Sequence, residues 1–334
     1  MNIDRTTRRM LVLHAGALGD CILTLHWIEA VRRAWGAMNV TLAARSPIAH
    51  WAARHGLVTE ALTLDSIGAH RLYFPLIELP DDLIRFVGGF DTVVSFLDGP
   101  EAPVSRGLTA IAGDRLIAID PRPTDATKRE GVHIVEQWLG GVGLAETKQH
   151  GSPGLRLVLT SGRRRVARET LLERLTPRGP MSSPIALCHP GSGGLDKCCP
   201  IEALEAVMEG LAERELATGW MMGPDEVDRF GSALRSRLER LAPVVFEENI
   251  ADAAELLLGA DLYVGNDAGM THAAALCGAR TIALFGPTDP RVWRPLGREC
   301  ETVSFPDPSL CVEAWVRETV ELAVGALLRR PATE

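Results

Sequence analysis

The sequence has 334 residues, of which 46% are hydrophobic and 23% are charged, as is typical of globular proteins. This length exceeds what a single hydrophobic core usually serves, so two domains are expected. A formal net charge of -8 excludes general nucleic-acid binding, which needs a basic surface to neutralise phosphates. A membrane span takes about 18 consecutive uncharged apolar residues, and no segment provides them.

From residue 10 to about residue 143, short β-rich runs alternate with longer amphipathic segments. The expected strands are MLVLH, NVTLAA, LVTEALTL, DTVVSFL and DRLIAID, and the first helix is DCILTLHWIEAVRRAW. This alternation predicts a parallel sheet with crossover helices in residues 1–150. The basic opening and the apolar run after it resemble a secretory signal, but the glycines and polar residues at positions 14 to 20 break that run. We therefore read the opening as part of the first domain.

Residues 151–183 interrupt this rhythm with GSPG, TPRGPMSSP and an arginine run, and we expect them to be an interdomain linker. The arginine run, GRRRVAR, forms either a solvated helix face or a contact with an anionic lipid or acceptor. The alternation resumes in residues 184–308 and predicts a second domain of the same kind. The last segment, residues 309–330, is read as an amphipathic helix that packs back on the N-terminal domain.

Seven cysteines without a repeating pattern do not predict a disulfide framework and favour a reducing compartment, the cytoplasm. The stretch HPGSGGLDKCCP, residues 189–200, holds a histidine and two of these cysteines, which invites a metal interpretation. The cysteines are adjacent, however, so they form no Cys-x-x-Cys pair, and no metal site is expected. Backbone N–H groups in its glycine-rich turn can instead form an anion nest beside Lys197, so we predict a phosphate site at Gly191, Ser192, Gly193 and Lys197.

Three other loops follow predicted strands, where open α/β sheets bind ligands. In HAGALGDC, Gly19 permits a close approach, and Asp20 falls where a helix opens, where a simple capping role competes with a functional one. In MMGPDEVD, Glu226 either meets a ribose hydroxyl or starts a helix. No Gly-x-Gly-x-x-Gly motif follows the first strand, which disfavours a dinucleotide site and an NAD-dependent oxidoreductase.

The most informative segment is GADLYVGNDAGMTHAAALCGARTIALFGPTDP, residues 259 to 290. Asn266 and Asp267 form a polar turn after a buried strand, and the helix that follows offers the free N–H groups of its first turn to a diphosphate. His272 lies in that first turn, where a functional role competes with that of a buried structural histidine. The predicted contacts of this segment with a diphosphate-bearing ligand are Asn266, Asp267, Gly269, Met270 and His272.

Taken together, LVLHAGALGDCILTLHWIEAVRR, HPGSGGLDK, GPDE and the segment 259–290 resemble glycosyltransferase family 9, the heptosyltransferases of lipopolysaccharide core assembly. The segment GVHIVEQWLGGVGL, residues 131–144, is also similar to this family. The resemblance implies an α/β GT-B fold, in which two Rossmann-like lobes with parallel sheets face each other across a cleft. It also implies an inverting reaction without a metal or other cofactor, with a nucleotide sugar such as ADP-heptose as co-substrate.

By matching position, the resemblance assigns Asp20 as the catalytic base, Lys197 to the donor diphosphate, and Asp267, Gly269 and His272 to the donor-binding turn. The sequence departs from the family after the lysine, where the family usually continues to a tryptophan and a proline and this sequence has KCCP. An anionic glycolipid or glycan acceptor is implied, with basic candidates at Arg45, Arg71, Arg106, Lys128 and Arg129 and with Gly19 beside the base. Such an acceptor predicts peripheral contact with the inner face of the cytoplasmic membrane.

Two other functions fit the same two-lobed fold, because a fold alone does not fix function. One is a non-catalytic nucleotide-sugar-binding protein, which would not require a carboxylate at position 20. The other is a nucleotide-sugar epimerase, which would turn over the donor in the absence of any acceptor.

Overall fold

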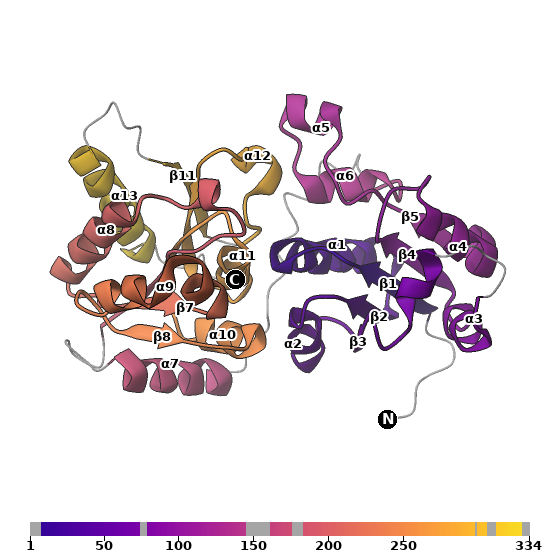
Figure 1. Cartoon of the computed structure of the whole chain (residues 1–334), viewed down its shortest axis with the longest axis horizontal. Helices are drawn as coiled ribbons and strands as arrows, with labels where there is room; N and C mark the ends of the chain where they lie inside the picture. Colours follow the sequence, from indigo (N-terminus) through magenta and orange to yellow (C-terminus); the bar gives the residue numbers. More distant parts are fainter. Residues whose placement is uncertain are drawn as a thin grey trace. The chain divides into compact units, whose positions relative to one another are not determined.

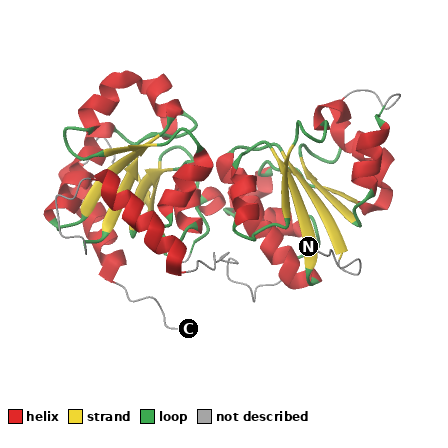
Figure 2. Ribbon diagram, turned by 90° about the horizontal axis from the view of Figure 1, so that it is seen from below, coloured by secondary structure: helices red, strands yellow, loops and turns green. Residues whose placement is uncertain are grey.

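The computed structural model of the chain describes residues 8–73, 79–144, 161–175, 183–297, 299–305 and 312–328. The chain divides into two compact units, Met1–Leu155 and Arg156–Glu334, and each contains one parallel sheet. Figure 1 labels the elements, and Figure 2 shows that helices cover both faces of each sheet. Both units are therefore Rossmann-like α/β domains, as the alternation of strands and helices predicts.

The first unit has five parallel strands in the order β3-β2-β1-β4-β5. Its elements are β1 (Arg8–His14), α1 (Leu18–Trp35), β2 (Met38–Ala44), α2 (Ile48–Arg54), β3 (Glu60–Thr63), η1 (Ala69–Tyr73), α3 (Asp81–Gly88), β4 (Thr92–Phe96), α4 (Pro103–Ala112), η3 (Gly113–Arg115), β5 (Leu116–Ala118), α5 (Asp125–Glu130) and α6 (Ile134–Gly140). Helices on both faces bury the central strand β1, so its sequence is a continuous apolar run rather than an alternating one. The strand order reverses at β1, which is the position where open α/β sheets bind ligands.

The second unit has six parallel strands in the order β11-β10-β9-β6-β7-β8. Its elements are α7 (Ser161–Leu175), β6 (Ile185–His189), η4 (Leu195–Lys197), α8 (Ile201–Glu213), β7 (Ala217–Met222), α9 (Pro224–Leu238), β8 (Val244–Phe246), α10 (Ile250–Leu257), β9 (Leu262–Asn266), α11 (Gly269–Leu276), β10 (Arg280–Phe285), α12 (Pro290–Trp293), β11 (Cys300–Ser304) and α13 (Val312–Leu328). Here the order reverses between β6 and β9. The loops after these two strands are HPGSGG and NDAGMTH, the two segments predicted to bind the donor.

One segment differs from its predicted role as a linker. Within the predicted linker 151–183, residues Ser161–Leu175 form helix α7, which packs against α10, β7 and β8 of the second unit. The rest of that linker lies outside the described residues, apart from Ser183 onward. The C-terminal helix α13 packs against α8 and β10 of the second unit, and its contact with the N-terminal domain stays a prediction.

The arginine run in α7 is occupied by ion pairs within its own unit. Arg164 and Arg168 both bind the carboxylate of Asp261, at 3.1 Å for Arg164, and Arg163 lies 3.7 Å from Glu255. The carboxylate of Asp261 also accepts a hydrogen bond of 2.9 Å from the backbone N–H of Ile185, at the start of β6. These arginines therefore fasten α7 to its sheet, a role that neither reading of the run anticipated.

Candidate functional site

The best-formed site lies in the second unit, where the loops after β6 and β9 meet. The two strands pair in parallel, with His189 opposite Gly265, so their carboxyl ends lie at the same edge of the sheet. The hydroxyl of Ser192 donates a 2.7 Å hydrogen bond to the backbone carbonyl of Asp267 and joins the two loops. The structure thus brings together residues that are 75 positions apart in the sequence.

Asp267 is the centre of this cluster. Its Oδ2 accepts hydrogen bonds from Lys197 Nζ at 2.9 Å and from the hydroxyl of Thr288 at 2.7 Å. The Asp267 side chain is only 8% exposed, whereas that of Lys197 is 34% exposed. An ammonium group has three N–H donors, so Lys197 can hold Asp267 and still offer donors to a ligand. Thr288 was not predicted, although its position after β10 was the available signal.

The first turn of α11 completes this cluster. The N–H groups of Gly269 and Met270 come before the first intrahelical hydrogen bonds, so they are free to bind an anion. His272 is buried, and its Nδ1 has no hydrogen-bond partner among the described residues. Burial lowers the pKa of His272 to about 4, against the opposing effect of Asp267, so the imidazole is neutral at pH 7. A neutral ring can still exchange hydrogen bonds with a ligand without adding charge.

Glu226 has a structural role in this site. One carboxylate oxygen lies 3.2 Å from His189 Nε2, and the other accepts a 2.8 Å hydrogen bond from the N–H of Gly223 at the start of α9. Burial acts to raise the pKa of Glu226, but these hydrogen bonds hold it below its ordinary value. Glu226 therefore has the predicted role at the start of a helix. Both of its oxygens also keep lone pairs that can accept a hydrogen bond from a ribose hydroxyl. Gly191 packs directly on this carboxylate, because a Cβ added there would lie 2.0 Å from Oε1.

Asn266, predicted as a donor contact, binds the backbone of the glycine-rich loop. It is fully buried, and its Nδ2 donates to the carbonyls of Pro190 at 2.9 Å and Gly191 at 3.2 Å. Its Oδ1 accepts a 2.9 Å hydrogen bond from the N–H of Cys199. Through these three contacts Asn266 shapes the loop, and its contact with the donor stays a prediction.

Arg229, on the exposed face of α9, holds the other end of the same loop. Its guanidinium donates to the carbonyl of Ser192 and, at 3.4 Å, to that of Gly193. The sequence provided no sign of this contact, because the partners are 36 and 37 residues away.

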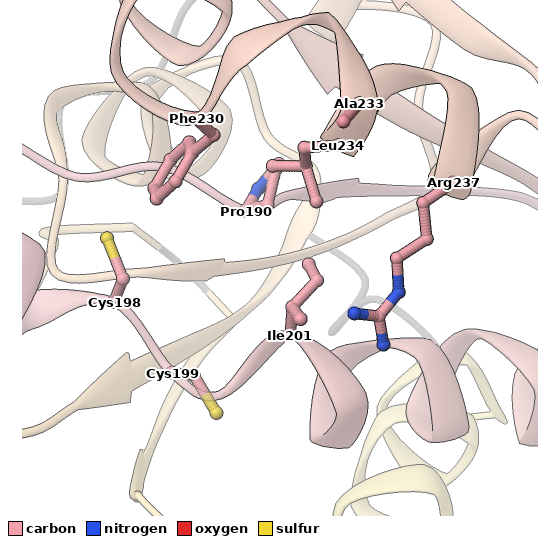
Figure 3. A pocket seen from close by; sticks show the side chains of 8 residues that line it. All are labelled: Pro190, Cys198, Cys199, Ile201, Phe230, Ala233, Leu234 and Arg237. Atoms are coloured by element: carbon pink, nitrogen blue, oxygen red, sulfur yellow. The ribbon is translucent and has the colours of Figure 1, made fainter.

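Beside the loop, a pocket of about 430 Å³ opens between α8 and α9 (Figure 3). It is lined by Pro190, Cys198, Cys199, Ile201, Phe230, Ala233, Leu234 and Arg237. Two small thiol side chains, those of Cys198 and Cys199, border this space. Burial raises the pKa of Cys199 to about 12, with Cys198 adding to the shift, so Cys199 stays a protonated thiol.

In the first unit, Asp20 lies in the first turn of α1, directly after the turn that follows β1. Ala17, the N-cap residue, has no side-chain hydrogen bond to cap the helix, and Asp20 is half-buried. Gly16 packs between Asp20 and His14, since a Cβ added there would lie 2.9 Å from Asp20 Oδ2 and 2.8 Å from His14 Cε1. Burial lowers the pKa of His14 to about 4, so a neutral imidazole lies next to the predicted base. His14 was not predicted as part of the site.

The basic candidates for acceptor binding are all exposed but lie on different elements of the first unit. Arg45 directly follows β2, and its backbone N–H donates a 3.1 Å hydrogen bond to the carbonyl of His14 beside the Asp20 turn. The others are Arg71 on η1, Arg106 on α4, and Lys128 and Arg129 on α5. Gly19 precedes Asp20 in α1. Of these candidates, Arg45 is the one whose backbone bonds to the residue that begins the Asp20 turn.

Among the described residues, no group of three or more His, Cys, Asp or Glu side chains is placed to hold a metal ion. No helix in the described part of the chain is long and apolar enough to cross a membrane.

Comparisons with known proteins extend this picture. The profile described as "Glycosyltransferase family 9 (heptosyltransferase)" matches residues 128–317, which is more than half of the chain. A curated relative, "Lipopolysaccharide heptosyltransferase 1" of Pseudomonas aeruginosa, is 35% identical over 100 residues. That match spans 28% of this chain and 27% of the relative, so it covers about a quarter of the relative's length.

Solved structures are similar over nearly the whole chain. A glycosyltransferase family 9 protein from Veillonella parvula has a TM-score of 0.71 at 16% identity, covering 98% of this chain and 99% of its own. E. coli ADP-heptose heptosyltransferase II has a TM-score of 0.70 at 14% identity, covering 95% and 99%. E. coli heptosyltransferase WaaC with ADP has a TM-score of 0.61 at 17% identity, covering 94% and 100%. These likenesses confirm the predicted GT-B fold.

Proposed function

The chain belongs to glycosyltransferase family 9, and we propose that it is an inverting, metal-independent enzyme that transfers heptose from ADP-heptose. The proposed acceptor is a lipopolysaccharide core or a related anionic glycan. One observation carries this proposal: Lys197, Asp267 and the first turn of α11 meet the glycine-rich loop where the second sheet reverses its strand order.

The donor half of the proposal rests on charge. Breaking the bond between the sugar and the diphosphate leaves negative charge on the departing ADP. Lys197 and the N–H groups of Gly269 and Met270 are fixed donors that can stabilise this charge as it develops. In the proposed reaction these donors take the place of a divalent ion. The similar E. coli WaaC structure was solved with ADP, which supports ADP as the leaving nucleotide here.

The acceptor half of the proposal rests on Asp20. A sugar hydroxyl is a poor nucleophile at neutral pH, so a carboxylate must accept its proton as the new bond forms. The hydroxyl oxygen bonds to the anomeric carbon while the bond from that carbon to the phosphate oxygen breaks. Attack from the face opposite the leaving group inverts the configuration at that carbon. We propose that Asp20 takes the proton and that Arg45 contacts the anionic acceptor.

We further propose that the enzyme acts in the cytoplasm, in peripheral contact with the inner face of the membrane that carries its acceptor. An anionic acceptor would meet the exposed basic side chains Arg71, Arg106, Lys128 and Arg129 of the first unit. Such contact needs no spanning helix.

The first test is calorimetric titration of the metal-free protein with ADP, UDP, GDP and their sugar conjugates. Selective binding of ADP and ADP-heptose in the presence of EDTA is expected, and transfer to a core oligosaccharide should survive EDTA. Preference for UDP or GDP would change the donor, and loss of transfer in EDTA would contradict metal independence. Donor turnover without an acceptor would indicate an epimerase.

The second test is Asp20→Asn, which preserves the shape of the side chain but cannot accept the proton. Transfer should fall by at least about 100-fold, while ADP affinity stays within a few-fold. Asp81→Asn is the matched control, since Asp81 also lies in the first turn of a helix, α3. Equal losses of transfer in both variants, or an equal loss of ADP affinity in Asp20→Asn, would show that Asp20 is only a helix-end carboxylate.

A further inference from the structure

The backbone carbonyls of the glycine-rich loop are all occupied by hydrogen bonds. The carbonyls of Pro190 and Gly191 accept from Asn266 Nδ2, and those of Ser192 and Gly193 accept from the Arg229 guanidinium. The next carbonyl, that of Gly194, accepts a 3.2 Å hydrogen bond from the backbone N–H of Lys197. Five successive acceptors are thus removed from the surface that a ligand would meet.

The geometry of the peptide bond sets the direction of the remaining donors. In a trans peptide the C=O of one residue and the N–H of the next point in opposite directions, and the described residues contain no cis bond. Because Arg229 draws the carbonyls of Ser192 and Gly193 toward itself, the N–H groups of Gly193 and Gly194 point away from it. Neither N–H donates a hydrogen bond to another described residue.

The space at Gly193 is open, whereas the carboxylate of Asp196 lies beside Gly194, where an added Cβ would be 2.5 Å from Oδ1. A Cβ added at Gly193 would meet no atom within 4 Å, and Gly193 is exposed. Lys197 belongs to the same loop and is partly exposed beside it. The same short loop therefore carries two N–H groups without a partner among the described residues and one ammonium group, which are donors suited to an anion.

We propose that Arg229 is a positioning residue of the donor site, which orients the N–H groups of Gly193 and Gly194 toward the diphosphate. This inference rests on the proposed function, since it takes ADP as the ligand. Arg229 itself does not touch the diphosphate. Its guanidinium donates hydrogen bonds to two neighbouring loop carbonyls at once, and this planar arrangement of donors is one that a lysine cannot reproduce.

The test compares ADP and adenosine binding to Arg229→Gln and Arg229→Lys by calorimetry. Arg235→Gln is the matched control, because Arg235 lies in α9 beyond its break at Gly231 and pairs with Glu239. Losing two aligned donors to a charged group should weaken ADP binding of Arg229→Gln by about 10- to 100-fold. Adenosine affinity and the unfolding temperature should stay near wild type, and Arg229→Lys should recover only part of the ADP affinity.

Three results would overturn the inference. ADP affinity of Arg229→Gln within about two-fold of wild type would show that the loop keeps its orientation unaided. Full recovery in Arg229→Lys, or an equal loss in Arg235→Gln, would mean that charge alone matters. Equal losses for ADP and adenosine would mean a general collapse of the site. A wild-type chain that binds no ADP would instead refute the proposed function, and the inference with it.

Discussion

Adding one methyl group to the glycine-rich loop should have opposite effects at two positions only two residues apart. In Gly191→Ala the new Cβ would lie 2.0 Å from Glu226 Oε1, so the carboxylate must move by more than 1 Å to reach ordinary contact, roughly 3.3 Å. That movement breaks the 3.2 Å contact with His189 and strains the 2.8 Å hydrogen bond from Gly223. In Gly193→Ala the Cβ meets nothing within 4 Å.

The magnitudes follow from these contacts. A hydrogen bond to a charged group contributes about 1.5–3 kcal/mol, so Gly191→Ala should destabilise the second unit by about 2–4 kcal/mol. Gly193→Ala should stabilise it by about 0.4–1 kcal/mol, because alanine restricts the unfolded chain at a compatible backbone conformation. The same substitution should weaken ADP binding, since its methyl group enters the space assigned to the diphosphate.

Urea-induced unfolding measures both effects. The two units of this chain need not unfold together, so the midpoint of each transition is followed separately. Glu226→Gln serves as a third variant, because it weakens the contact with His189 without adding a methyl group. Similar midpoints for Gly191→Ala and Gly193→Ala would refute the close packing of Gly191 on Glu226.

Two further predictions concern charge. Lys197→Ala should lower ADP affinity by at least about 10-fold, with a smaller difference from wild type at high salt because screening weakens the lost attraction; an equal difference at all salt concentrations would contradict a direct charge contact. The buried imidazoles of His14 and His272, whose pKa values are about 4, should make stability pH-dependent, because the unfolded chain protonates them near pH 6.5. Their contribution is present above pH 6.5 and is lost as the pH falls toward 4, by up to about 3 kcal/mol for each histidine. Urea unfolding between pH 7 and pH 4.5 should show a shallower pH dependence in His272→Asn, and an unchanged slope would contradict the shifted pKa.

The strand–helix rhythm and the glycine-rich turns were predictable because they depend on local sequence. Period and turn composition place β1, β6 and β9 and the loops that follow them, and those loops hold Asp20, Lys197 and Asp267. The exposed edge strand β11 was not predicted, since its residues lack the apolar run of a central strand.

The partners of the site residues could not be predicted, because they depend on contacts between distant segments. Asn266 is polar and follows a buried strand, which suggested a ligand contact, yet it serves the backbone of a loop 75 residues away. Arg229 resembles any exposed arginine on an amphipathic helix until its carbonyl partners are known. Helix α7 was assigned to a linker because its charged composition conceals the ion pairs that hold it.

The binding of α7 also bears on the order in which the second unit can be completed during synthesis. Arg168 is translated 93 residues before Asp261, the carboxylate that binds it. Until then α7 has no anionic anchor at that position, and Gly259, whose missing side chain lets the α7 backbone approach closely, has not been made either. Contacts between such distant residues close slowly, since a long loop must be ordered first. The contacts of α7 with Asp261 and Gly259 can thus form only after β7 and β8, the strands against which it also packs, have been made.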